Sequence, residues 1–346
     1  MATPELSLVI PALNESAIIL GNVDELSSWL IENLPDISYE VIVVNDGSTD
    51  GMGELLEEAR AERPWLQVAH HPTNMGRGRG VRTGFAHARG DFVICLDADL
   101  SYTPDHIPGL LEPLRSGEAD LTLASAHHPQ GSVVNVPLQR ELLSRWGNRV
   151  LRLGYDRKYY TVTCVVRGYA RHVIDTLELV SDGKDLHLEI IQKAQLMGYR
   201  ILEVPATLKW RNKQRHRNTK FGLPEFALFK MRRTVLSHLI FNYITNPGVL
   251  LLIPILALLA AIVFGCGMLA IAFIHNLAVL DASLMQVARL TLLNGQLTLL
   301  VVSFAFIFLM VFVGFYFLSF QSKRYFDETY TLMMRMNSRI RRLEED

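Results

Sequence analysis

The stretch Asp91-Phe-Val-Ile-Cys-Leu-Asp-Ala-Asp99 decides the fold expected of this chain. Its five consecutive apolar residues and the acidic residues that follow them are typical of a buried strand in a parallel sheet. Two similar runs, Leu6–Ile10 and Tyr39–Val44, come earlier and end at turn residues. Segments with helical spacing of apolar residues separate the three runs. This alternation predicts a doubly wound α/β sheet, whose ligands collect at the carboxyl ends of the strands.

Later segments continue the alternation with less regularity. Residues 120–125 and 200–203 are expected to form strands, and residues 138–153 and 185–197 are expected to form helices.

The composition excludes several classes of protein. The 346 residues contain 34 Lys and Arg against 35 Asp and Glu, so there is no overall basic field for nucleic acid. The three cysteines form no CxxC pair, so neither a disulfide framework nor a zinc site is expected. No positively charged leader precedes Leu6–Ile10, and this run is too short for the core of a signal peptide. We therefore expect the N-terminal domain to stay in the cytoplasm.

The C-terminal third has the composition of a membrane segment. Residues 248–274 and 290–322 contain no charged side chain, and each run exceeds the roughly 20 residues that cross a bilayer as a helix. Two buried helices of a soluble domain are the alternative, which such length without a polar face disfavours. Lys and Arg precede the first run and follow the second, so the positive-inside rule places both termini in the cytoplasm. Residues 225–246 fit either an interfacial helix or a solvated connector.

The paired acids Asp97 and Asp99 are candidate metal ligands. At the end of a strand, two carboxylates one residue apart can point into one cleft and supply part of the octahedral oxygen shell of Mg²⁺ or Mn²⁺. The metal would also bind a nucleotide diphosphate and neutralise its charge as it departs. Carboxylates after strands are also common turn and cap residues. The motif therefore indicates a metal site only in combination with the other motifs of the chain.

Two further motifs follow the earlier apolar runs. In Asn45-Asp-Gly-Ser-Thr-Asp-Gly51, Asp46 can accept hydrogen bonds from a base or ribose, and either Ser48 or Asp50 can cap a helix. Pro11-Ala-Leu-Asn-Glu15 would supply another wall of the same pocket, although Glu15 could simply begin a helix.

The segment Asn74-Met-Gly-Arg-Gly-Arg-Gly80 predicts a glycine-rich, cationic turn that opens a helix. It lacks the lysine and the spacing of a GxxxxGK[ST] phosphate loop. Either Arg77 or Arg79 could contact phosphate, and either could instead be solvated.

Together these motifs resemble family 2 inverting glycosyltransferases with a GT-A fold. The resemblance is to the polyprenyl-phosphate branch, which includes dolichol-phosphate mannose synthase and bacterial undecaprenyl-phosphate glucosyltransferases. It implies a nucleotide-sugar site with Mg²⁺ or Mn²⁺ on Asp97 and Asp99. Carried over to this chain, the donor-binding residues would be Pro11, Leu13, Glu15, Val44, Asp46, Arg77, Asp97, Ala98, Asp99 and Lys220.

The same resemblance implies a lipid-phosphate site in the second half of the chain. Arg140 and Ser144, four residues apart on one helical face, would bind the acceptor phosphate together with Lys220. Asp99, Arg140 and Ser144 would then be the catalytic residues. A solvated Arg140 is the alternative.

Glu189, Glu203-Val-Pro205 and Thr219-Lys220 also look like later motifs of the family. Three features depart from its pattern, and one of them is that the arginine usual six residues before the late lysine is displaced, with Arg211, Arg215 and Arg217 nearby instead. Ala126, followed by His127 and His128, stands where an arginine is usual, and Thr161 replaces an aspartate.

The resemblance implies transfer of a hexose, with inversion, from a GDP-mannose or UDP-glucose type of donor to a membrane polyprenyl phosphate. The chain would lie in a bacterial or archaeal cell membrane. Its expected parts are a GT-A catalytic domain at 1–224, an interfacial helix at 225–246, spans at 247–275 and 290–322, and a cytoplasmic helix at 323–346. The residues leave open the sugar, the base, the polyprenol and whether the chain forms a homo-oligomer.

Two alternatives remain at this level. A processive polysaccharide synthase is disfavoured, because Leu142 stands where the glutamine of a QxxRW motif would be and two spans are too few for an export channel. A catalytically idle, membrane-tethered nucleotide-sugar binder or assembly scaffold would explain the changes at Ala126 and Thr161. Retention of both acids and of Arg140 argues against it.

Overall fold

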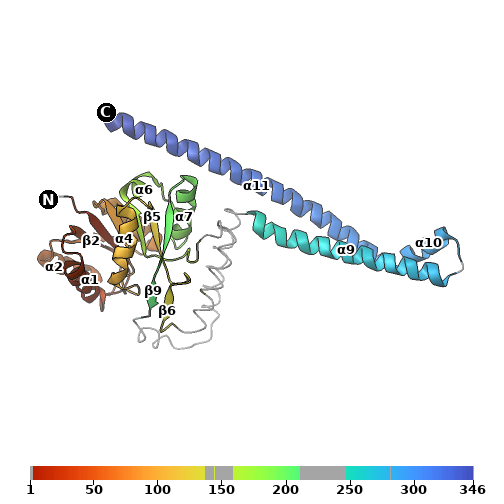
Figure 1. Cartoon of the computed structure of the whole chain (residues 1–346), viewed down its shortest axis with the longest axis horizontal. Helices are drawn as coiled ribbons and strands as arrows, with labels where there is room; N and C mark the ends of the chain where they lie inside the picture. The colour runs from red at the N-terminus through yellow and green to blue at the C-terminus, as the bar shows by residue number, and fades with distance from the viewer. Residues whose placement is uncertain (1–2, 137–143, 145–158, 211–246, 281, 346) are drawn as a thin grey trace. The chain divides into compact units, whose positions relative to one another are not determined.

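The computed structural model describes residues 3–136, 144, 159–210, 247–280 and 282–345. The chain divides into two compact units (Figure 1). One comprises residues 1–238 with 331–346, and the other comprises residues 239–330.

The first unit contains a seven-stranded sheet in the order β3-β2-β1-β4-β7-β5-β8, in which only β7 runs antiparallel to its neighbours. A small parallel pair, β6-β9, lies apart from it. The strands are β1 (Leu6–Ala12), β2 (Tyr39–Asn45), β3 (Leu66–His70), β4 (Phe92–Cys95), β5 (Leu121–Ser125), β6 (Ser132–Val134), β7 (Arg167–Ala170), β8 (Ile201–Pro205) and β9 (Thr207–Lys209).

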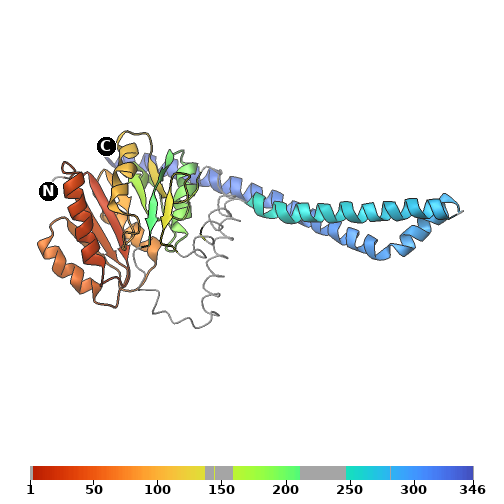
Figure 2. The same ribbon diagram turned by 60° about the horizontal axis from the view of Figure 1, so that its bottom comes forward.

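Helices lie on both faces of this sheet (Figure 2). They are α1 (Ile19–Asn33), α2 (Met52–Glu62), α3 (Arg77–His87), the short 3₁₀ turn η1 (Pro104–His106), α4 (Ile107–Arg115), α6 (Arg171–Thr176) and α7 (Leu186–Leu196). The predicted α/β fold is therefore confirmed, with strands at β5 and β8 and a helix at α7 where we expected them. The helix expected at 138–153 lies outside the described residues, apart from Ser144.

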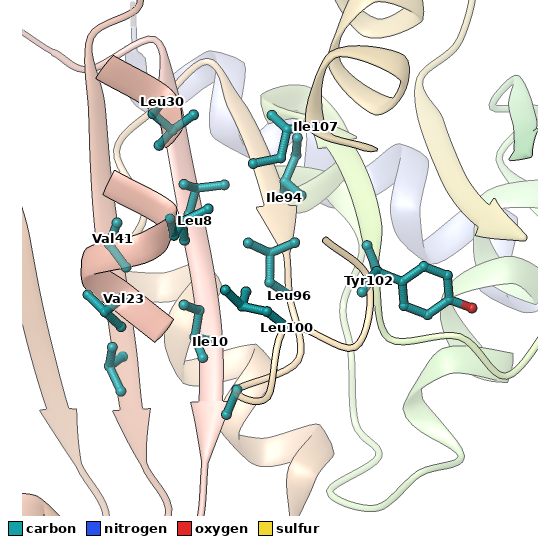
Figure 3. Close-up of a cluster of buried hydrophobic side chains, with 14 of the residues drawn as sticks. Leu8, Ile10, Val23, Leu30, Val41, Ile94, Leu96, Leu100, Tyr102 and Ile107 are labelled. Atoms are coloured by element: carbon teal, nitrogen blue, oxygen red, sulfur yellow. The ribbon is translucent and has the colours of Figure 1, made fainter. Parts of the chain in front are cut away.

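The two faces of β1 pack against different helices. Leu8 and Ile10 face Val23 and Leu30 of α1 in a fully buried cluster (Figure 3). Val9 points to the opposite face, where Gly84 of α3 approaches so closely that a Cβ would overlap Cγ1 of Val9. The alternation of side chains along the strand thus buries both faces of the sheet.

Strand β7 was not predicted from the sequence. Its four residues include Arg167, which is fully buried and donates to the backbone carbonyls of Cys164, His187 and Val162 at 2.7–2.8 Å. Arginine and glycine are unusual in a central strand. Here three carbonyl oxygens take the place of the water that would hydrate the guanidinium. These hydrogen bonds offset the free-energy cost of burying it.

The second unit is a helical hairpin with a short third helix. Helices α9 (Pro247–Val279) and α11 (Gln296–Glu345) cross, with α10 (Leu284–Asn294) at the turn between them, and α11 continues past residue 330, where this unit ends (Figures 1 and 2). Leu251–Val279 and Gln296–Met333 are long and apolar enough to cross a membrane. The first residues of the predicted 290–322 run belong to α10, because a capping box at Ser283 starts a separate helix there.

Small residues close the hairpin. A Cβ on Gly265 of α9 would overlap Val302 of α11, and one on Gly295 would overlap Leu269 of α9. Asn276 also donates to Thr291 Oγ1 at 3.0 Å, which ties α10 to α9. Close backbone approach at small residues, with a polar bond between helices, is how helices pack in lipid.

Replacing Gly84 by alanine should destabilise the protein, because the added methyl group has no space against Val9. Such overpacking typically costs about 1–3 kcal/mol. We expect a lower midpoint of thermal unfolding for the detergent-solubilised full chain. Gly21 in α1 is the matched control, since nothing lies within 4 Å of its Cβ position and alanine favours a helix there. A Gly84→Ala protein as stable as the Gly21→Ala protein would contradict this packing.

Candidate active site

A pocket of about 320 Å³ opens at the carboxyl ends of β1, β2 and β4. It brings together most of the residues that the sequence motifs indicated. Its lining consists of Pro11, Ala12, Leu13, Glu15, Asp46, Asn74, Arg77, Asp97, Ala98 and Asp99. Ala12 and Asn74 belong to those motifs but were not singled out. Val44 is fully buried within β2 and is not part of the lining.

The first two motif loops are held together by hydrogen bonds. Asn14 lies in the left-handed region, with φ 53°. Its backbone N–H donates to Ser48 Oγ at 2.9 Å, and its side-chain oxygen accepts from Thr49 N at 2.8 Å. Ser16 N donates to Asp50 Oδ2 at 2.9 Å. Ser48 and Asp50 therefore connect the loops. Gly51 occupies the N-cap position of α2, and Asp50 Oδ1 also accepts from Met52 N, the first residue of that helix, at 3.2 Å.

Asp46 is the most firmly held side chain of the pocket. Its Oδ1 accepts from Nδ1–H of His71 at 2.7 Å and from Met75 N at 2.9 Å, and its Oδ2 accepts from Gly76 N at 3.0 Å. The next residue, Gly47, has φ 71°, and a Cβ there would overlap the backbone of Thr73. Only glycine combines this conformation with so close an approach.

His71 is a residue of the site that sequence reasoning missed. Its side chain is 7% exposed, and its Nε2 lies 2.8 Å from Thr83 Oγ1 of α3. It therefore connects Asp46 to the helix that follows the glycine-rich turn. The sequence offered no signal for this role beyond its place a few residues before Asn74.

The paired acids both face the pocket. Burial raises the pKa of Asp97. The nearby Arg77 lowers this pKa and Asp99 raises it further, and the net shift is upward. The Asp97 side chain is nevertheless 24% exposed. Arg77 Nη1 lies 3.7 Å from Asp97 Oδ1. Asp99 Oδ1 accepts from Ser101 N at 3.0 Å, which orients the second carboxylate. An anionic group beside a cationic one suits a ligand that carries both a metal ion and phosphate.

The structure separates the two candidate arginines. Arg77 lines the pocket, whereas Arg79 Nη1 lies 4.0 Å from Asp182 Oδ1 on a loop behind α3. That loop packs so closely that a Cβ on Gly76 or Gly78 would overlap its backbone. The glycines of this motif thus allow a protein contact, in addition to any contact with phosphate.

Glu189 holds the same loop from α7. Its carboxylate accepts from Val180 N at 2.9 Å, from Ser181 N at 2.8 Å and from Lys193 Nζ at 2.6 Å. Burial alone would raise its pKa, but these donors outweigh burial and the net shift is downward. Glu189 is therefore placed to support the wall behind the glycine-rich turn.

The acceptor-side candidates are only partly described. Arg140 and Lys220 lie outside the described residues. Ser144 is described, and its Oγ lies 3.1 Å from His127 Nε2. Thr161 stands where an aspartate was expected. Its hydroxyl oxygen lies 2.8 Å from Ser125 Oγ. Glu203 accepts from the backbone N–H groups of Tyr160 and Thr161 at 2.7–2.9 Å.

Comparison with known proteins identifies the family. Residues 7–177 match the family model described as glycosyl transferase family 2. The undecaprenyl-phosphate mannosyltransferase of Micrococcus luteus is 31% identical over 208 residues, which are 58% of this chain and 81% of that protein. The chain belongs to glycosyltransferase family 2.

A second relative belongs to the same polyprenyl-phosphate branch. The dolichol-phosphate mannosyltransferase of Pyrococcus furiosus is 31% identical over 206 residues, which are 59% of this chain. The match spans only 56% of that relative's length. The resemblance drawn from the motifs is thereby confirmed.

A solved structure supports the fold of this glycosyltransferase. Glucosyl-3-phosphoglycerate synthase from Mycobacterium tuberculosis, in complex with Mn²⁺, UDP-glucose and phosphoglyceric acid, superposes with a TM-score of 0.51 at 22% identity. The match covers 70% of this chain and 80% of that one. At this identity the likeness concerns the GT-A fold alone.

Replacing His71 by alanine should weaken nucleotide-sugar binding, because Asp46 then loses a charge-assisted donor and its tie to α3. A hydrogen bond to a charged group contributes about 1.5–3 kcal/mol, so we expect the dissociation constant to rise about tenfold or more. Titration calorimetry with the purified protein measures it. His71→Asn keeps a donor near the position of Nδ1 and should recover most of the affinity. Equal affinity of the wild-type and alanine proteins would remove His71 from the site.

Proposed function

We propose that this glycosyltransferase moves a hexose from a nucleotide-diphosphate sugar to a membrane polyprenyl phosphate, with inversion at the anomeric carbon. One observation carries the proposal: Asp46 and the pair Asp97 and Asp99 line a single pocket at the carboxyl edge of the sheet. The two long apolar helices and the names of the relatives support a lipid acceptor.

The pocket has two chemically different parts that suit the two ends of the donor. Asp46, fixed by two donors on Oδ1 and one on Oδ2, keeps acceptor capacity on Oδ2 for the base or ribose, next to Pro11 and Glu15. Arg77 and the acidic pair suit the diphosphate. In this assignment the leaving group lies between Arg77 and the carboxylates.

The donor set of the pocket fits Mg²⁺ or Mn²⁺. Among the described residues no cluster of three or more His, Cys, Asp and Glu side chains could hold a metal by itself. Two carboxylates with open positions for phosphate oxygens and water suit an ion that is bound through its substrate. Asp97 and Asp99 would hold it, and its chemistry there is to neutralise charge on the departing diphosphate.

The acceptor requires little activation. A phosphate monoester has a second pKa of about 6, so it is largely ionised at neutral pH and needs no strong general base. The protein must instead bring two anions together, which is the role proposed for Arg140, Ser144 and Lys220. An oxygen of the lipid phosphate then attacks the anomeric carbon as its bond to the nucleotide diphosphate breaks.

Turnover of a radiolabelled nucleotide sugar to an organic-extractable lipid tests this function and excludes an idle binder. Purified protein should transfer label to undecaprenyl phosphate from one of the UDP- or GDP-sugars. Asp99→Asn should lower this transfer by about 100-fold or more, because it removes a carboxylate from the proposed metal site. EDTA should abolish transfer reversibly.

Asp36→Asn is the control for charge loss, since Asp36 is exposed and lies outside the pocket. Full activity of Asp99→Asn, or full activity in EDTA, would remove the metal from the mechanism. Absence of labelled lipid with every donor would refute the function itself.

We also propose that both termini face the cytoplasm, where nucleotide sugars are supplied. The support is the position of Lys and Arg beside the two apolar helices. Single cysteines in place of Ala282 and Met336, both exposed, report the two sides. A membrane-impermeant maleimide should label intact cells at position 282 and only lysed cells at position 336. Labelling at position 336 in intact cells would overturn this topology.

A further inference from the structure

A pair of histidines, His127 and His128, follows the carboxyl end of β5. His127 and His128 are both half-buried, but they make different contacts. The ring of His128 meets the ring of Tyr160 edge-on at 5.5 Å, and its Nδ1 accepts from Gln130 N at 3.2 Å. His127 instead directs Nε2 to Ser144 Oγ at 3.1 Å. His128 therefore contacts residues within and beside the turn, whereas His127 contacts Ser144, which lies 17 residues later in the chain.

The backbone at His127 is connected to the loop that contains Thr161. Its N–H donates to Thr161 Oγ1 at 3.4 Å, and the same hydroxyl lies 2.8 Å from Ser125 Oγ. The N–H of Thr161 donates to Glu203 at 2.7 Å. These bonds connect the end of β5 to β8, so the imidazole is presented from a preorganised base rather than from a free loop.

The arginines next to β5 in the sheet are committed to other partners. Arg167 gives its guanidinium to three backbone carbonyls. Arg200 pairs with Asp120 at 2.9 Å, beyond the opposite end of the strand. Neither is directed toward Ser144. The imidazole of His127 is a cation-forming group in contact with this serine.

An imidazole and a hydroxyl in contact form a donor pair for an oxyanion. Each can give one hydrogen to a different oxygen of the same phosphate, and the imidazole adds charge when it is protonated. In the structure these two groups bond to each other through His127 Nε2 and Ser144 Oγ.

We propose that His127 binds the phosphate of the lipid acceptor together with Ser144. This inference rests on the proposed function, in which Ser144 belongs to the acceptor site. It adds a ligand that the sequence motifs did not indicate, on the acceptor side of the reaction and not the donor side.

The test separates the two phosphate-bearing substrates. With the full chain in detergent, KM for a short-chain polyprenyl phosphate and the dissociation constant of the nucleotide sugar are measured on the same variants. His127→Ala should raise the acceptor KM about tenfold or more, as expected for loss of a charge-assisted donor, and should leave donor affinity within twofold. His127→Gln, whose amide nitrogen can replace Nε2, should recover part of the loss.

His128→Ala is the matched control and should change the acceptor KM less than twofold. The polyprenol without its phosphate should not compete with the acceptor in the wild-type protein, which distinguishes phosphate binding from chain binding. Inorganic phosphate competing as well as the lipid would assign a general anion site and overturn the inference.

Other outcomes also decide. An unchanged acceptor KM in both His127 variants would overturn the inference. The proposed function would still stand in that case, provided that the wild-type protein transfers the sugar. Parallel losses of donor and acceptor affinity, with a lower unfolding midpoint, would make His127 structural and equally overturn it. Failure of the wild-type protein to form any labelled lipid would refute the proposed function instead.

Discussion

The parallel pairing of β1 with β2 and β4 is the constraint on which the site depends. Its register places Ala12 opposite Asn45 and Val9 opposite Cys95, so the three strands end at one edge of the sheet. The loops that follow them therefore converge. Consecutive parallel strands need a crossover connection, which is usually a helix. Helices α1, α2 and α3 supply these connections and also cover the two faces of the sheet. The pocket is thus a consequence of topology before any polar contact is considered.

Hydrogen bonds then convert converging loops into a defined surface. Asp46 collects donors from His71, Met75 and Gly76, which ties the second motif to the third. Asn14 exchanges bonds with the loop after β2. Because each bond joins different loops, displacement of one would disturb the others, and the pocket is organised by the protein's own contacts.

The second unit follows another physical rule, because its surface is apolar and its contacts are few. In the 18-residue apolar window of each candidate span only 6% of the residues are buried within the protein, which is consistent with helices that cross a membrane. Gly265 lets the two long helices approach, and Gly295 at the end of α10 lets that helix approach α9. The proposed transfer from a water-soluble donor to a lipid acceptor would require both environments, and the chain keeps its polar pocket and its apolar helices in separate units.

The sequence by itself determined the α/β class, the two long apolar helices and most of the pocket lining. Each depends on local order: apolar runs, their lengths, and motifs directly after strands. The tertiary structure alone decided which polar side chains meet. It separated Arg77 from Arg79, excluded Val44 from the lining, and placed His71 behind Asp46. It also brought His127 to Ser144 and buried Arg167 in an antiparallel strand. These contacts join residues distant in the chain, and a side chain's partner is set by the packing of whole elements, which no local pattern encodes.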